Sequence, residues 1–132
     1  RHCANALKVA QWLSADPRIS WVSFPGLEED KYHALAEKYM PNGTCGVISF
    51  GVPGGREKVS AFLDHLKMVS IATHVADARS CTLYPAGTTH RQLTEEQLIE
   101  AGVGIDLVRL SCGIENADDI ITDLDQALAA VQ

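Results

Sequence analysis

The segment from Thr44 to Val52 constrains the fold of this chain more than any other part of the sequence. β-Branched and aromatic residues dominate it, and these residue types favour a strand over a helix. Gly46 and Gly51 also lie in this segment, and glycine inside a strand marks a bulge or a close approach of another backbone. The pattern predicts a buried central strand. A ligand lying against the glycines is the alternative that it leaves open.

Apolar spacing around this segment predicts further strands and helices. Three more short runs have strand character: residues 19–24, 81–84 and 107–111. Apolar residues three and four apart predict five helices: residues 2–14, 31–39, 55–66, 94–101 and 116–131. Residues 68–79 have no clean period. Helices and strands do not alternate strictly, so we expect an α+β fold, with a small, mostly antiparallel sheet covered by helices.

Helix starts and buried faces can also be predicted from local patterns. Asp30 and Asn116 are expected to cap the helices that follow them, and residues 94–97 (Thr-Glu-Glu-Gln) have the form of a capping box. The second helix is expected to place Tyr32, Leu35, Ala36 and Tyr39 on one face. The last helix is expected to bury Ile121, Leu124, Leu128 and Val131.

Composition excludes several classes of protein. The chain is 46% hydrophobic and 21% charged, which favours a folded core over disorder. Its net charge of -6 disfavours nucleic acid as a partner, and no apolar run approaches the ~20 residues of a membrane span. The start of the chain has no signal-peptide pattern. Four scattered cysteines without a CxxC pair fit a reduced, cytoplasmic protein, and the five histidines lack the spacing of metal ligands.

Two stretches carry the residue types expected of a binding site. Residues 73–80, followed by residues 84–90, gather hydroxyls, His74, His90, an acid and a base around small residues. Such a loop either faces a ligand or is an ordered surface loop held by an internal contact between Asp77 and Arg79. The second stretch is the strand around Arg109, whose neighbours in the sequence are both apolar. Its guanidinium must leave on the face away from the core, where it can bind a carboxylate or simply meet solvent.

Five strings in this sequence occur in the same order in a known family. They are VSFPGL (residues 22–27), GVISF (46–50), ADARS (76–80), PAGTTH (85–90) and VRLSCGIE (108–115). The chain thereby resembles the C-terminal part of the pyridoxal-phosphate (PLP) enzymes of Cys/Met metabolism. It is most similar to their O-acetylhomoserine sulfhydrylase (homocysteine synthase) branch. The resemblance implies the fold-type-I PLP-dependent transferase architecture, with residues 1–132 as its C-terminal substrate-binding small domain.

The resemblance also implies roles for individual residues. Arg109 would bind the α-carboxylate of an amino-acid substrate, and His74 and Thr89 would complete the substrate-binding set. The family often has serine or asparagine at the position of His74 and a histidine at that of Tyr84. These departures leave open cystathionine γ-synthase, a γ-lyase or a free-standing amino-acid-binding module as alternatives to the formation of homocysteine from O-acetylhomoserine and sulfide.

The cofactor lysine of the family lies in a Ser-x-Thr-Lys type of context, which none of the five lysines of this chain has. The resemblance therefore implies that PLP is bound mainly by an N-terminal large domain absent from this chain. We expect residues 1–132 alone to hold no catalytic or cofactor-binding residue and to be inactive. The intact enzyme is expected to be a homo-oligomer, specifically a homotetramer.

Overall fold

The computed structural model describes residues 1–132 and has an α+β fold, as predicted. Its helices are α1 (His2–Ala15), α2 (His33–Tyr39), α3 (Gly55–Asp64), α4 (Glu95–Glu100) and α5 (Ala117–Ala129), with a short 3-10 turn η1 (Pro85–Gly87). Its strands are β1 (Trp21–Ser23), β2 (Val47–Gly51), β3 (Ser70–Ile71), β4 (Cys81–Leu83) and β5 (Leu107–Ser111). No helix is both long and apolar enough to cross a membrane.

The five strands form one sheet in the order β1-β2-β5-β4-β3. Every neighbouring pair is antiparallel except β3 and β4, which run parallel, so the predicted mostly antiparallel sheet is confirmed. The segment that most constrains the fold contributes β2, and β2 pairs along its whole length with β5. These two strands are the centre of the molecule.

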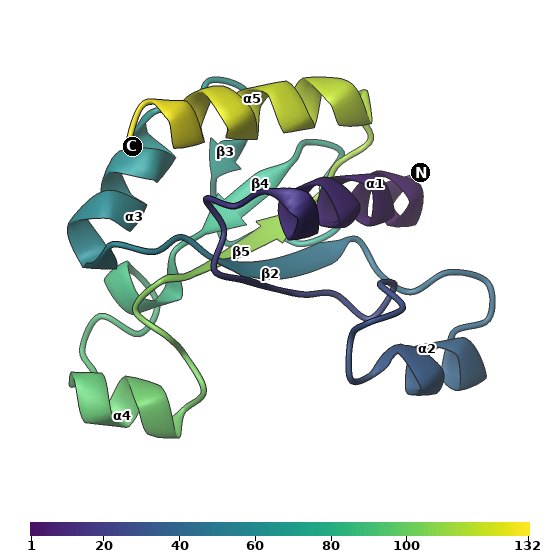
Figure 1. Cartoon of the computed structure of the whole chain (residues 1–132), viewed down its shortest axis with the longest axis horizontal. Helices are drawn as coiled ribbons and strands as arrows, with labels where there is room; N and C mark the ends of the chain where they lie inside the picture. Colours follow the sequence, from purple (N-terminus) through teal and green to yellow (C-terminus); the bar gives the residue numbers. More distant parts are fainter.

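The core lies between one face of the sheet and a layer made of α1, α3 and α5 (Figure 1). Val108 and Leu110 point into it from β5, directly opposite Phe50 and Ile48 of β2. The ring of Phe50 meets that of Phe62, from α3, edge to face with the ring centroids 6.3 Å apart. Helices α2 and α4 stand apart from this layer, toward opposite ends of the molecule (Figure 1).

Helix starts were predicted with mixed success. Thr94 and Gln97 form the expected capping box at α4, and the Asn116 side chain accepts a hydrogen bond from Asp118 N at the start of α5. The prediction that Asp30 caps the second helix is wrong. Its carboxylate instead accepts hydrogen bonds from the backbone N–H groups of Phe24 and Tyr32, and α2 begins only at His33.

Two predicted apolar faces also differ from the structure. On α2 only Ala36 is buried, because no other helix or strand packs extensively against this helix. Tyr32, Leu35 and Tyr39 are half exposed or more. On α5 the buried stripe is shifted by one residue at its start, since Ile120 rather than Ile121 is fully buried. Leu124 and Leu128 are buried as expected, whereas Val131 lies beyond the end of the helix and is only half-buried.

Candidate functional site

Arg109 lies in the middle of β5 and emerges on the face of the sheet away from α1, α3 and α5. Its neighbours Val108 and Leu110 are fully buried in the core, so strand alternation directs the arginine to the opposite face, as predicted. The residues directly beside it on that face are Ser49 of β2 and Leu83 of β4. Arg109 therefore stands on a central strand that is paired on both sides, with β2 and with β4, which is a rigid base for a binding residue.

The guanidinium of Arg109 has spare hydrogen-bonding capacity. Its Nη2 donates to the carbonyl oxygen of Thr73 at 3.0 Å. Its Nε is shielded from solvent and has no partner in the chain. Arg109 takes part in no ion pair, whereas Arg18 pairs with both Asp16 and Asp125. A buried N–H on a cation without an acceptor is costly, which makes Nε of Arg109 a candidate donor to a bound acceptor.

The loop that carries Thr73 connects β3 to β4 and includes His74, which is exposed. The contact between Asp77 and Arg79 that was one of two interpretations of this loop is present, at 3.5 Å. Hydrogen bonds from the backbone and side chain of Arg79 lower the pKa of the Asp77 carboxyl below its usual value. Thr73 brings this loop to Arg109, and His74 is the next residue along it.

Thr89 follows η1 and is not hydrogen-bonded to Arg109. Its Oγ1 instead hydrogen-bonds Nδ1 of His90 at 2.9 Å, and its side chain is exposed. Tyr84, at the start of the same segment, is buried and donates from its hydroxyl to the carbonyl oxygen of Ile105 at 2.8 Å. Burial raises the pKa of the Tyr84 hydroxyl. The tyrosine therefore joins the core and anchors the segment.

Sequence patterns gave no role to Ser80, Ser111 and Glu115, yet all three hold the loop between β3 and β4. The backbone N–H of Ala76 donates to Ser111 Oγ at 3.3 Å. Ser80 donates to the Glu115 carboxylate from both its N–H and its hydroxyl, at 2.6 and 2.9 Å. One sequence feature could have pointed to the contact between Ser80 and Glu115: they belong to two of the five family strings, although they lie 35 residues apart.

The four cysteines are all free thiols. Cys81 and Cys112 are buried in the core region, and Cys3 is exposed. Burial raises the pKa of the Cys112 thiol to about 12. No group of three or more His, Cys, Asp or Glu side chains lies close enough to hold a metal ion.

The fold and the site define a small α+β domain that presents an unpaired, partly buried arginine on the open face of its sheet. The whole-chain pattern identifies its family: residues 1–129 match the model of the Cys/Met metabolism PLP-dependent enzymes, and the chain belongs to this family.

Relatives of this chain are consistent with that assignment. It is 48% identical to an O-acetyl-L-homoserine sulfhydrylase of Leptospira meyeri, over 97% of this chain and 29% of the relative. It is 47% identical to a homocysteine synthase of Schizosaccharomyces pombe, over 97% and 30%. A crystal structure of a putative O-acetylhomoserine (thiol)-lyase of Campylobacter jejuni with a pyridoxyl-lysine phosphate superimposes with a TM-score of 0.89 at 40% identity, over 97% of this chain and 30% of that one. The chain thus spans under a third of the length of these relatives.

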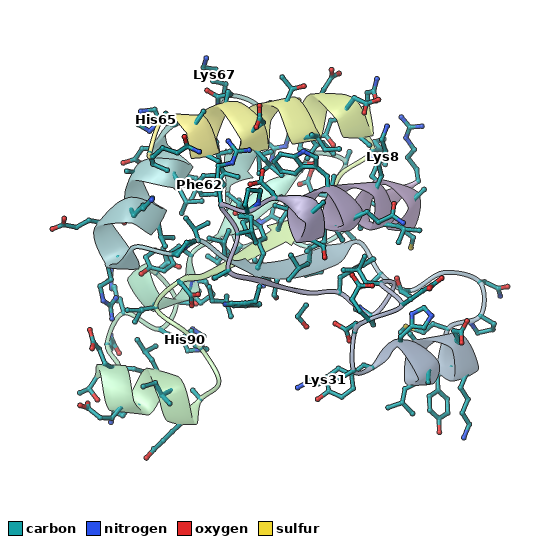
Figure 2. The ribbon with its side chains drawn as sticks, viewed as in Figure 1. Lys8, Lys31, Phe62, His65, Lys67 and His90 are labelled. Atoms are coloured by element: carbon teal, nitrogen blue, oxygen red, sulfur yellow. The ribbon has the colours of Figure 1, made fainter.

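The lysines of this chain do not fit a cofactor site. None of them lines any of the four surface cavities, and Lys8 is paired with Asp118 at 2.6 Å. Lys8, Lys31 and Lys67 point outward, whereas Phe62 points into the interior (Figure 2). We therefore assign no step of the cofactor's chemistry to residues of this chain.

Proposed function

We propose that residues 1–132 are the C-terminal substrate-binding small domain of an enzyme that makes homocysteine from O-acetylhomoserine and sulfide. Arg109 binds the α-carboxylate of the amino-acid substrate. The single observation that carries this proposal is the guanidinium of Arg109, whose Nε is buried without a partner while its Nη2 is fixed by Thr73. A planar guanidinium held in this way suits the two oxygens of a carboxylate.

The reaction exchanges one substituent on the substrate. The bond between Cγ and the ester oxygen breaks, a bond between Cγ and sulfur forms, and hydrogen sulfide gives up a proton as acetate leaves. PLP, when bound elsewhere in the enzyme, supplies the electron sink for proton loss from the substrate. The residues of this chain bind and orient the amino acid: Arg109 fixes its carboxylate, and we propose that His74 and Thr89 face the rest of the substrate.

Steady-state kinetics of the complete protein test this proposal. Homocysteine formation should be measured with O-acetyl-L-homoserine and sulfide for the wild type and for Arg109→Lys. Loss of the paired hydrogen bonds should lower kcat/KM about a hundredfold, mainly through KM. Arg18→Lys is the control, because Arg18 is also held by acceptors of this chain, the carboxylates of Asp16 and Asp125, but makes no hydrogen bond to a residue of the proposed site. It should stay within about twofold of the wild type.

Other outcomes would overturn the proposal. Equal losses in the Arg109 and Arg18 variants would remove Arg109 from the binding site. Formation of cystathionine from cysteine in preference to homocysteine from sulfide would assign the enzyme to the γ-synthases. Release of an oxo acid without any added sulfur nucleophile would assign it to the γ-lyases.

We also propose that the same polypeptide contains a large PLP-binding domain, that the intact enzyme is a homotetramer, and that it is cytoplasmic. The coverage of under a third of the relatives supports a further domain. The free cysteines support a reducing compartment. Light scattering on the complete protein measures the number of subunits, and a monomer would contradict the tetramer.

A further inference from the structure

The loop between β3 and β4 is fastened at several points to the strand that carries Arg109 and to the residues after it. Near its start, Thr73 accepts from Arg109 Nη2, and the Ala76 N–H donates to Ser111 Oγ. Further along, the N–H of Ile114 donates to the carbonyl oxygen of Ala78 at 2.9 Å. Successive residues of the β5 segment therefore hold successive residues of the loop.

The far end of the loop is held by a group that we call the Ser80–Glu115 clamp, made of Ser80, Gly113 and Glu115. Both oxygens of the Glu115 carboxylate are occupied by Ser80, whose hydroxyl also accepts from the N–H of Gly113 at 2.9 Å. Ser80 is fully buried. A side chain on Gly113 would collide with the backbone of Ala78 and Arg79, so the loop lies directly against this residue.

The clamp is itself tied to α1. Asn5 is buried and donates from Nδ2 to the carbonyl oxygens of Gly113 and Glu115, at 2.9 and 2.8 Å. Arg1 donates to the Glu115 carbonyl oxygen at 3.1 Å. No cation neutralises the Glu115 carboxylate, since it takes part in no ion pair. The only hydrogen-bond partner of the Glu115 carboxylate in the chain is Ser80. We therefore infer that this carboxylate serves to fix the loop.

In its middle the loop is held by single hydrogen bonds, from Ala76 N–H to Ser111 and from Ile114 N–H to Ala78. Ala76 has a φ of 59°, a left-handed conformation that is unusual for a residue other than glycine, and the surrounding contacts must hold it there. The guanidinium of Arg109 makes its one hydrogen bond in the chain to this loop. A shift of the loop therefore moves the only group that orients the guanidinium.

We propose that Ser80 and Glu115 are positioning residues for Arg109: the clamp sets the place of the Thr73 carbonyl and thereby the angle at which the guanidinium meets the substrate carboxylate. This inference rests on the proposed function and deepens it. Displacing a binding group by about 1 Å can cost up to about a hundredfold in rate, so a residue that touches no substrate can still control substrate binding.

The test measures carboxylate recognition separately from folding. In the complete protein, inhibition or turnover should be compared for O-acetyl-L-homoserine and its α-carboxamide, which keeps the size but loses the charge. Ser80→Ala should reduce the preference for the carboxylate roughly tenfold, by raising KM for O-acetylhomoserine while leaving the constant for the carboxamide nearly unchanged. Glu115→Gln retains one acceptor oxygen and should have an intermediate effect, smaller than that of Glu115→Ala.

Matched controls exist at the other end of β5. Asp106 accepts from the Ser20 hydroxyl at 3.1 Å and from Trp21 Nε1 at 2.9 Å, so it is also a carboxylate holding a serine, but without a link to the loop. Ser20→Ala and Asp106→Asn can lower thermal stability, yet they should leave the preference for carboxylate over carboxamide as in the wild type. This separates a positioning role from a merely structural one.

The outcomes distinguish the two levels of the proposal. In one outcome the wild type prefers the carboxylate and Arg109→Lys abolishes that preference, but Ser80→Ala and Glu115→Ala keep it in full. The positioning role is then wrong, and the proposed function stands. If the wild type has no preference, or Arg109→Lys keeps it, the proposed function itself fails. A graded loss in the order Glu115→Gln, then Ser80→Ala and Glu115→Ala, with unchanged controls, supports the clamp.

Discussion

The carboxylate of Asp123, in the middle of α5, accepts a hydrogen bond at 2.9 Å from the backbone N–H of Met68, which lies 55 residues earlier in the chain. The same carboxylate accepts from the N–H groups of Lys67 and Val69, each at 2.8 Å. Asp123 is buried, with 5% of its surface exposed. One acidic side chain therefore closes the turn between α3 and β3 and places β3 at the edge of the sheet.

Replacing Asp123 by alanine should leave three backbone N–H groups without an acceptor beneath α5. We expect the free energy of unfolding of the 132-residue chain to fall by about 2–4 kcal/mol, measured by urea denaturation. Asp119→Ala, an exposed site in the first turn of the same helix, is the control and should cost less than about 1 kcal/mol. Equal effects of the two substitutions would contradict this role of Asp123.

The buried thiol of Cys112 should be unreactive in the folded chain. Burial disfavours the charged thiolate and raises its pKa from 9.0 to about 12, so almost none is ionised at pH 8. Because the folded-state pKa is raised, its contribution to stability is complete below about pH 9 and is lost as the pH rises toward 12. Iodoacetamide at pH 8, followed by peptide mass spectrometry, should label the exposed Cys3 and spare Cys112. Labelling at equal rates without denaturant would show that Cys112 is not buried.

The capping box of α4 should control the local stability of that helix. Thr94 Oγ1 accepts from the N–H of Gln97, and the Gln97 side chain accepts from the N–H of Thr94. Thr94→Ala should cost about 1 kcal/mol and speed hydrogen exchange over residues 95–100 about fivefold. Thr122→Ala is the control, because its hydroxyl only bonds back to Asp118 O within α5. Unchanged exchange in α4 of the Thr94 variant would rule out the cap as the source of its stability.

The central strands could be predicted because their burial follows from local alternation. Leu107–Ser111 forms β5 as expected, since Val108 and Leu110 can be buried together only on one face. Arg109 then has to emerge on the other face, which is why its orientation could be inferred from the sequence. The two-residue β3 could not be predicted, because its pairing with β4 depends on a turn held by the distant Asp123.

Apolar spacing overestimated the burial of α2. Tyr32, Leu35 and Tyr39 have the period of a buried face, but only contacts with other elements decide whether such a face is covered. The Ser80–Glu115 clamp escaped prediction for a related reason. Its partners lie 33 and 35 residues apart in the sequence. The acceptor for Arg109 is a backbone carbonyl, and because every residue type has one, the sequence does not reveal it.

The most direct test of the central claim is a crystal structure of the complete protein with an unreactive analogue of O-acetylhomoserine bound. The quantities to measure are the distances from Arg109 Nε and Nη to the carboxylate oxygens of the ligand. We predict two hydrogen bonds of about 2.7–3.0 Å, one of them to Nε, with the bond from Nη2 to Thr73 retained. A carboxylate held by other residues, with Nε of Arg109 still unpaired, would contradict the claim.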